Sequence, residues 1–316
     1  MNQHELRKQI TEQIVKALEG NVIPWRKPWS SSPNAGRPAN IVSRKPYSGV
    51  NPHLLRLHQL RFGFSSRWYA TFQQWKNAGY CVSKRPADVP SGAWGCQILF
   101  ARPFTKKVVD KETGEEVEES FHMLRFYTVF CADQVEGADE YRVQPEPDNG
   151  HVPDFDPAEE LVQASGAEIH CSNEDRAYYK RPTPFDAWPN HSDGDSIVMP
   201  HRSNFNSQVD WYSTLFHELG HFCEVRTGWD HRKHGYALGE LAAEMAGCFL
   251  ATELGVPQSD DLTNHVSYLK SWLESMKGDP SFLFKASSQA SRVCDYLLAR
   301  AGRAVEPEPV GAGQEE

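Results

Sequence analysis

The chain has 316 residues, of which 39% are hydrophobic and 24% are charged. Single domains usually contain roughly 100–200 residues, so this length predicts two domains, each with enough apolar residues for a core of its own. No stretch approaches the ~20 consecutive apolar residues of a membrane helix, and the polar, amphipathic N-terminus lacks an apolar signal core. These features argue against a membrane protein and against a secreted one.

The seven cysteines are scattered along the chain and never form a C-x-x-C pair. An odd number of widely spaced cysteines is typical of a reducing compartment, and it argues against both a disulfide framework and a cysteine zinc cage. We therefore expect a cytoplasmic protein.

The net charge of -9 conceals an uneven distribution. Residues 1–110 contain 17 Lys or Arg and 5 Asp or Glu, whereas the remaining residues contain 16 and 37. A basic first part favours a polyanionic partner such as nucleic acid, although a solvated basic surface would have the same composition.

In the N-terminal part, apolar residues recur every four positions over residues 5–18, which predicts a helix that ends at Gly20. The segment 24–52 is rich in Pro, Ser, Asn and Gly and indicates a loop that carries aromatic and cationic side chains.

A second helical pattern covers residues 51–79, where three aromatic residues follow one another at spacings of three or four: Trp68, Phe72 and Trp75. Strands are then expected at 94–102 and 121–130, joined by a hairpin whose tip lies at 113–114.

An acidic, proline-rich segment without periodicity, residues 133–157, is expected to link two domains. The elements expected after it are a helix at 158–165, strands at 167–171 and 196–199, and helices at 207–226, 236–254, 259–277 and 280–301. Residues 303–316 are expected to be disordered. This order predicts an α+β protein with a mixed α/β domain at 1–132 and a mainly helical domain with a small sheet at 158–302.

A metal-binding motif lies in the helix expected at 207–226. His217 and His221 are four residues apart, so they share one face and can offer two imidazole nitrogens to one Zn²⁺. Glu218 beside them can act as the general base that takes a proton from a water at the zinc and directs its attack on a carbonyl. Two surface histidines on an amphipathic helix would be the alternative, but the apolar side of this helix favours a buried site.

A catalytic zinc site needs a third protein ligand, for which we predict Glu240. Glu240 and Glu244 are one turn apart in a small, apolar run, and buried carboxylates need a partner that a metal site supplies. In this arrangement Glu244 accepts the second ring N–H of a ligating histidine, although the two roles could be exchanged. The histidines of the polar loop, His231 and His234, are the rival third ligands.

Two weaker hypotheses concern the surroundings of this site. Tyr236 lies just before the Glu240 helix and could donate a hydrogen bond to a developing oxyanion, with packing as its alternative role. The strand at 197–199 is a candidate edge for aligning an extended peptide.

The basic N-terminal part places aromatic residues in loop sequence beside cations. Sequence-tolerant binding of single strands combines cations for phosphates with rings for base stacking. The residues that we predict to contact single-stranded DNA are Trp25, Arg26, Lys27, Trp29, Arg44, Lys45 and Tyr47. Core packing is the alternative for each ring, and it is favoured for the aromatic residues at helical spacing. No zinc finger, RNA-recognition motif or glycine-rich phosphate loop points to duplex reading.

The two halves together resemble the ArdC-like antirestriction proteins, which are also similar to the N-terminal region of TraC-type plasmid primases. The likeness extends over nearly the whole chain. It rests on Glu12-Gln13-Ile14-Val15, Pro24-Trp25, Pro28-Trp29, the segments 46–51, 68–75 and 197–200, HELGH at 217–221, Tyr236-Ala237, Glu240-Leu241 and Ala243-Glu244.

This resemblance implies an N-terminal single-stranded DNA-binding domain fused to a zincin-like metalloprotease domain, in a protein of conjugative plasmids that protects incoming DNA from host restriction. The sequence departs from the family pattern at one position. In that pattern two adjacent glutamates follow the Tyr-Ala pair, and here Gly239 occupies the position of the first. Glu240 and Glu244 keep the four-residue spacing, so we expect them to be the working carboxylates.

Together with the zinc motif and the basic aromatic segment, the resemblance implies an antirestriction protein that binds single-stranded DNA during conjugation and hydrolyses peptide bonds at a zinc site. Its protein substrate is unidentified, and a component of a restriction system is one candidate. A non-catalytic DNA-shielding protein with a structural or vestigial metal site is the first alternative, against which the retained Glu218 argues. A primase-associated DNA-binding protein is the second, disfavoured because no acidic polymerase constellation or zinc ribbon is evident.

Overall fold

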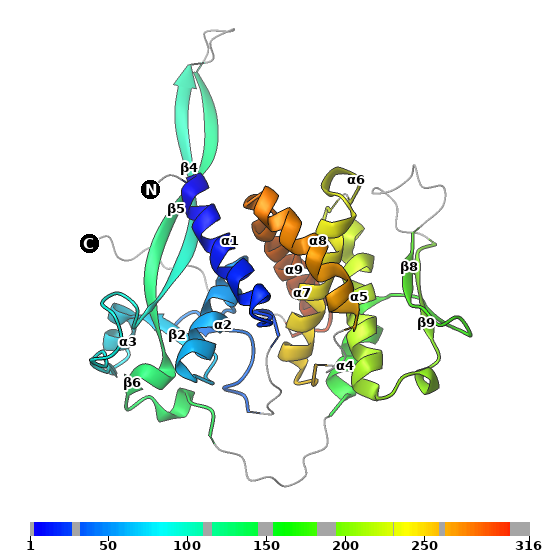
Figure 1. The fold of residues 1–316 in the computed structure, drawn as a ribbon, viewed down its shortest axis with the longest axis horizontal. Coiled ribbons are helices and arrows are strands. Elements are labelled where there is room, and N and C mark those ends of the chain that lie inside the picture. Colours follow the sequence, from blue (N-terminus) through cyan, green and yellow to red (C-terminus); the bar gives the residue numbers. More distant parts are fainter. Residues whose placement is uncertain are drawn as a thin grey trace.

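The chain folds into two units, an N-terminal mixed sheet with helices and a C-terminal helical bundle with a small sheet (Figure 1). This is the α+β architecture that the sequence predicts. The computed structural model describes residues 3–26, 32–109, 116–144, 154–181, 194–229, 231–258 and 263–303. In these ranges no helix is long and apolar enough to cross a membrane.

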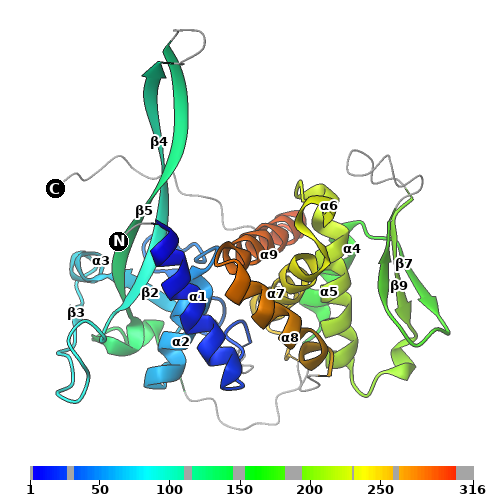
Figure 2. The same ribbon diagram turned by 45° about the horizontal axis from the view of Figure 1, so that its top comes forward.

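Helix α1 (Gln3–Glu19) joins the two units. Its predicted apolar face is buried, and Ile14 and Leu18 are 0% and 1% exposed. This face packs against α8 (Thr263–Gly278) and α9 (Ser281–Arg300) of the bundle, as the two views show (Figures 1 and 2). Although it opens the chain, α1 therefore covers the C-terminal unit.

The N-terminal sheet has the strand order β1-β2-β5-β4, with strands at Ala39–Asn40, Trp68–Thr71, Glu116–Cys131 and Cys96–Val109. β1 runs parallel to β2, and the other pairs are antiparallel. Asn51 fastens α2 (Asn51–Phe62) to the outer strand, because its side chain bonds both the N–H and the C=O of Leu99 at 2.8 Å.

The single helical pattern expected over residues 51–79 is wrong in its middle. Gly63 has φ 71° and ends α2, and residues 68–71 form strand β2 instead. A capping box between Thr71 and Gln74 then starts α3 (Phe72–Asn77). The aromatic spacing was misleading because Trp68 lies on a strand, whereas Phe72 and Trp75 lie on a short, separate helix on which Trp75 is buried and Phe72 exposed.

Strands β4 and β5 form a long hairpin that projects from the body (Figures 1 and 2). Their register runs from Cys96↔Val129 to Val109↔Glu116, so both strands are longer than the sequence predicts. The predicted tip at 113–114 lies outside the described residues.

The start of the predicted linker is built into the N-terminal unit. After a short 3₁₀ helix (Ala132–Gln134), β6 (Val135–Glu136) pairs with β3 (Cys81–Val82), and Val135 is fully buried beside Trp75. A second 3₁₀ helix (Asp139–Tyr141) completes this small cluster. The domain boundaries given above, residues 1–132 and 158–302, remain predictions.

The C-terminal unit begins with α4 (Asp156–Ser165) and a sheet of order β7-β9-β8, with strands at Ile169–Ser172, Ser196–Pro200 and Tyr178–Lys180. A 3₁₀ turn (Arg202–Asn204) leads into α5 (Gln208–Arg226), followed by α6 (His231–His234), α7 (Tyr236–Leu254), α8 and α9. The hypothesis that residues 197–199 form a sheet edge is wrong, since β9 is the central, fully buried strand and β8 is an edge.

Helices α5 and α7 approach closely because small residues line their contact. A Cβ on Gly220 of α5 would lie 2.8 Å from the Cα of Ala243, and one on Gly247 of α7 would lie 3.4 Å from the backbone N of His217. The contact brings the histidine face of α5 against the carboxylate face of α7.

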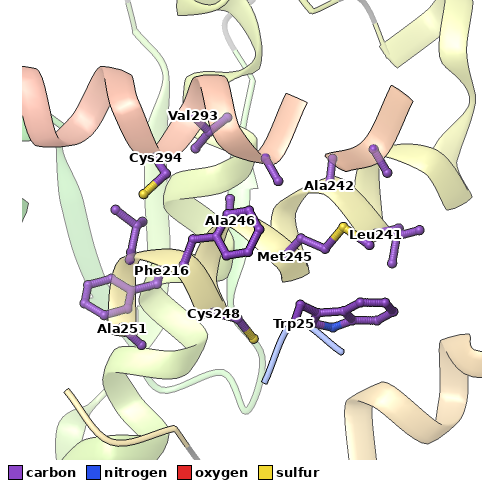
Figure 3. Close-up of a cluster of buried hydrophobic side chains, with 14 of the residues drawn as sticks. Trp25, Phe216, Leu241, Ala242, Met245, Ala246, Cys248, Ala251, Val293 and Cys294 are labelled. Atoms are coloured by element: carbon purple, nitrogen blue, oxygen red, sulfur yellow. The ribbon is translucent and has the colours of Figure 1, made fainter. Parts of the chain in front are cut away.

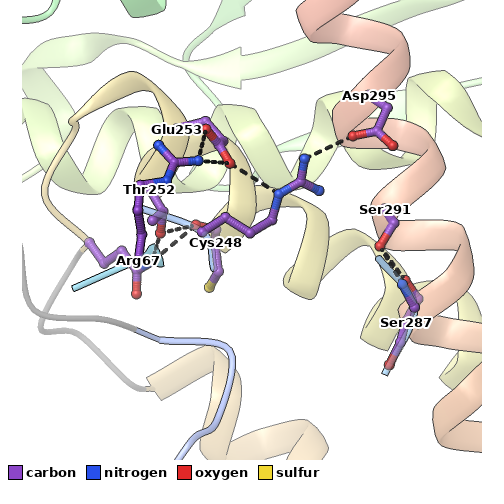
Figure 4. A network of polar contacts seen from close by, with 10 residues as sticks. Arg67, Cys248, Thr252, Glu253, Ser287, Ser291 and Asp295 are labelled. Atoms are coloured by element: carbon purple, nitrogen blue, oxygen red, sulfur yellow. Dashed lines mark hydrogen bonds and ion pairs between the residues drawn. The ribbon is translucent and has the colours of Figure 1, made fainter. Parts of the chain in front are cut away.

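The two units are joined by buried ionic and aromatic contacts. Arg37 is almost fully buried and bonds Glu253 of α7 at 3.0 Å and Asp295 of α9 at 2.8 Å, and Arg67 also reaches Glu253 (Figure 4). Trp25 enters the bundle core among side chains of α7 (Figure 3). The N-terminal unit is thus fixed to the helix that carries the carboxylates of the predicted metal site.

Candidate metal centre

The helix expected at 207–226 forms as α5, with the side chain of Ser207 capping its N-terminus. Its two histidines face each other, and the Nε2 atoms of His217 and His221 are 3.2 Å apart. Glu240 of α7 closes the group: its carboxylate oxygens lie 3.3 Å from the Nε2 of His217 and 3.4 Å from that of His221. The structure therefore brings together the three residues that the sequence selects as ligands.

A second carboxylate stands behind each histidine. Glu244 lies 3.7 Å from the Nδ1 of His217, which is close enough for charge attraction but too long for the hydrogen bond expected of it. The Nδ1 of His221 is 2.9 Å from Glu224 of α5, whose other oxygen binds Arg181 at 3.2 Å. The sequence analysis missed Glu224, although an acidic residue one turn after a ligating histidine is the signal that could have found it.

These carboxylates set the protonation of the site. Burial lowers the pKa of both imidazoles, but carboxylates oppose it: those of Glu240 and Glu244 leave the pKa of His217 well above its usual value. For His221, Glu224 and Glu240 outweigh burial and raise the pKa to about 9. At Glu240 burial raises the pKa of the carboxyl, but the two imidazoles outweigh it and hold this pKa below its usual range. The cluster attracts positive charge, which a divalent cation supplies by displacing these protons.

The donor set fits a metal ion. A neutral imidazole that donates its Nδ1–H to a carboxylate keeps a lone pair on Nε2, so three acceptors, two nitrogens and one carboxylate, point at a common position. Two ligands held at about 2.0–2.1 Å by one tetrahedral Zn²⁺ lie about 3.3 Å apart. The observed separations of 3.2, 3.3 and 3.4 Å match this value.

A cleft of about 650 Å³ opens onto the three ligands. Glu218 lines it beside His217 and is 7% exposed, so its carboxylate is largely shielded from bulk water. Residues 175–179 of the β8 segment form one wall, and Arg26 of the N-terminal unit contributes to the lining. The cleft can therefore hold an extended chain between β8 and the ligands.

Two tyrosines stand at the cleft. Tyr236 is 67% exposed, and its hydroxyl is 2.8 Å from that of Tyr268 on α8. Burial raises the pKa of Tyr236, as do the hydrogen bond to Tyr268 and the charge of Glu240. The sequence analysis singled out Tyr236 but missed Tyr268, which no local pattern connects to the motif.

The rival ligands are not part of the group. His234 stacks on Trp229 at 4.1 Å, and the metal-ligating cluster found among the described residues consists of His217, His221 and Glu240 alone. The side chain of His231 lies outside the described residues.

The aromatic residues predicted to contact DNA are largely buried where the structure describes them. Trp25 is 3% exposed and packs edge-on against Trp272 and His53, so its assignment as a stacking residue is wrong for this conformation. Tyr47 is half-buried against the main core and hydrogen-bonds Asn40, and burial raises its pKa to about 12. Lys27 and Trp29 lie outside the described residues.

The remaining predicted contacts are cations. Arg44 is exposed and stacks over Trp68 at 4.9 Å and Tyr141 at 5.3 Å. Lys45 is partly exposed beside it, whereas Arg26 lines the metal cleft. Among the described loop aromatics, Trp25 is buried in the main core and Tyr47 packs against it, which the sequence pattern did not indicate.

Comparison with known proteins matches both units. Residues 4–130 match the model of the N-terminal domain of the anti-restriction factor ArdC, and residues 156–289 match that of a zincin-like metallopeptidase. The crystal structure of the antirestriction ArdC protein from plasmid R388, in its metal-free form, is 28% identical and superimposes with a TM-score of 0.70, covering 95% of this chain and 98% of that one. The chain belongs to the ArdC-like antirestriction family.

Other ArdC-like relatives place this chain in a wider group. The Mn(II)-bound structure of the R388 protein gives a TM-score of 0.65 at 28% identity, over 94% of this chain and 98% of that one. The DNA primase TraC of Escherichia coli is 30% identical over 92% of this chain, which spans only 20% of the primase. An uncharacterized protein of Sinorhizobium fredii, y4eC, is 27% identical over 98% of this chain and 96% of its own length.

Proposed function

We propose that this chain is an antirestriction protein that binds single-stranded DNA and carries a divalent-metal-dependent peptidase site. The observation that carries the peptidase part is the convergence of His217, His221 and Glu240 beside Glu218 in one cleft. The Mn(II)-bound ArdC structure supports a divalent metal, and the two imidazole donors favour zinc or another imidazole-binding transition metal over Mg²⁺ or Ca²⁺.

The ligands would be the Nε2 atoms of the two histidines and the carboxylate of Glu240. When bound there, the metal supplies Lewis-acid chemistry, since it polarises a carbonyl and lowers the pKa of a water. Glu224 would orient the imidazole of His221 by accepting its Nδ1 proton. The charge of Glu244, 3.7 Å from the Nδ1 of His217, would favour the same ligating tautomer of that ring.

Glu218 is the general base of this proposal. Glu218 is not part of the metal-ligating group found among the described residues, and it lines the cleft next to the ligands. From this position it takes the proton of the attacking water and returns it to the leaving amine. A structural metal site needs no such group, which favours the peptidase over the DNA-shielding alternative.

Two further features of the cleft suit a peptide. Among the described strands β8 is an edge of its sheet, and this edge can pair with the main chain of an extended substrate. Tyr236, held by Tyr268, presents a hydroxyl that can donate to the developing oxyanion.

The DNA part of the proposal rests on the basic N-terminal unit and on the match to the ArdC N-terminal domain. The similarity to TraC primases supports DNA as the partner, although the chain spans 20% and 27% of the two primases. The protein substrate proposed for the peptidase site is a component of the restriction system.

Plasmid transfer tests the two activities together. We would compare the conjugation efficiency into restricting and non-restricting recipients for wild type, Glu218→Gln and Glu274→Gln, the last being an exposed glutamate of α8. The proposal expects protection by wild type and by the control, and its loss in Glu218→Gln with single-stranded DNA affinity unchanged. Full protection by Glu218→Gln would show that hydrolysis is dispensable and would favour DNA shielding.

A further inference from the structure

Exposed aromatic side chains gather where the β4–β5 hairpin leaves the body of the N-terminal unit. Phe100 is 54% exposed, Tyr127 is 41% exposed and Phe126 is 38% exposed, whereas the neighbouring Ile98 is 7% exposed. Leaving several large rings in water at one place forgoes the free energy of burying them, so such a group marks an interaction site.

Two of these rings share a face with an arginine. Phe100 lies directly opposite Arg125 in the β4–β5 register, and Tyr127 follows Arg125 by two residues, so the three side chains point to the same side of the sheet. The rings of Phe100 and Tyr127 meet edge to face, with centroids 6.1 Å apart and planes at 86°. Phe126 points to the opposite face.

Arg125 is exposed and makes no hydrogen bond or ion pair with any residue that the structure describes. Other arginines of this unit have internal partners. Arg37 and Arg67 bind Glu253 across the interface, and Arg44 stacks on Trp68. No described residue therefore competes with an external anion for the guanidinium of Arg125.

We infer that Phe100, Arg125 and Tyr127 form the surface on which single-stranded DNA stacks. This inference rests on the DNA-binding part of the proposed function and replaces the buried loop aromatics with exposed ones. Unpaired bases can stack on the two rings while the guanidinium pairs with a phosphate between them. The bases of a duplex are already stacked on one another and offer no free faces.

Charge and size favour this occupant over a second copy of the chain. Residues 1–144, which form the N-terminal unit, carry 20 basic and 14 acidic side chains, so the net charge of the unit is positive; it opposes pairing with a second copy and attracts a polyanion. A stable protein interface also needs about 800 Å² per partner, which three side chains do not supply.

The test is oligonucleotide binding by the full chain, measured by fluorescence anisotropy with a thymidine 20-mer and an abasic strand of equal length. We expect Phe100→Ala and Tyr127→Ala each to weaken binding of the thymidine strand about 5- to 150-fold, the range for one stacked base. Phe72→Ala removes an equally exposed ring on α3 of the same unit and should leave the affinity unchanged. The slope of log affinity against log salt concentration reports the number of phosphate contacts. Arg125→Ala should make this slope shallower by the equivalent of about one contact, whereas the ring variants should leave it unaltered.

The abasic strand separates stacking from general damage. Wild type and the double variant Phe100→Ala/Tyr127→Ala should bind it equally, with equal melting temperatures. If wild type binds the thymidine strand and the double variant binds it within twofold, the surface assignment is overturned while DNA binding stands. If wild type binds no strand, the DNA part of the proposed function fails as well. A wild-type dimer that the double variant loses would assign the face to a second copy.

Discussion

His221 and Glu224 lie one turn apart on α5, and the imidazole Nδ1 is 2.9 Å from a carboxylate oxygen of a residue that is only 3% exposed. The same glutamate binds Arg181, which directly follows β8. Glu224 therefore orients the imidazole of His221 and ties the small sheet to α5.

Replacing Glu224 with Gln should weaken metal binding about 10- to 100-fold, the usual cost of losing a carboxylate behind a ligating histidine. Competition with a chromogenic chelator measures the Kd of the metal. Glu174→Gln is the matched control, because Glu174 is exposed and pairs only with the exposed Arg176. An unchanged Kd for Glu224→Gln would remove this residue from the site.

Gly220→Ala should destabilise the protein by about 1–3 kcal/mol, since the added methyl would meet the backbone of Ala243 at 2.8 Å and push α5 away from α7. Metal affinity should fall with it, because the ligands are divided between these helices. Gly278→Ala is the control, as nothing lies within 4 Å of its Cβ position. Urea unfolding gives the free energies, and equal values for both variants would contradict the close approach.

Arg37→Ala should cost about 3–5 kcal/mol of unfolding free energy, because it leaves the buried end of Glu253 with only part of its ion-pair network. The exposed pair Arg176–Glu174 provides the comparison, and Arg176→Ala should cost about 0–1 kcal/mol. A double-mutant cycle with Glu253→Ala measures the coupling. Additive losses would show that the two units are not joined through this pair.

His53 should make the stability depend on pH. Burial lowers its pKa to about 3, with its ring stacked on Phe249 and its Nε2 3.0 Å from Ser287. Between pH 6.5 and 3 the unfolded chain binds the proton that the folded chain refuses, so the stabilisation present above pH 6.5 is lost as the pH falls. From pH 7.5 to pH 5 this residue should account for about 2 kcal/mol.

The check is the same pair of unfolding measurements on His53→Gln, which retains a polar partner for Ser287. The variant should lose less stability than wild type between the two pH values, by about the amount assigned to His53. An identical pH dependence would mean that His53 takes up its proton without unfolding.

Helices α5 and α7 could be predicted from sequence because strong local signals define them. Apolar periodicity gave α7 its bounds of 236–254, and the spacings of His217 with His221 and Glu240 with Glu244 selected the residues that meet in the cleft. These patterns are local, and a helix converts them directly into shared faces.

Non-local packing decided what the sequence could not reveal. The short strand β8 has too few residues to show alternation. Trp68 lies in a strand because β1 and β5 pair with the two sides of β2. Trp25 is buried because its loop crosses onto α7 and α8, a contact between residues more than 200 positions apart. Tyr268 likewise becomes a site residue only through the tertiary fold, which brings α8 to Tyr236.

The metal content of protein purified without chelator tests the central claim most directly. Elemental analysis should find about one divalent transition-metal ion per chain in wild type and in Glu218→Gln, and almost none in His217→Ala or Glu240→Ala. Wild-type protein without metal, or Glu240→Ala with a full complement, would contradict the metal centre formed by His217, His221 and Glu240.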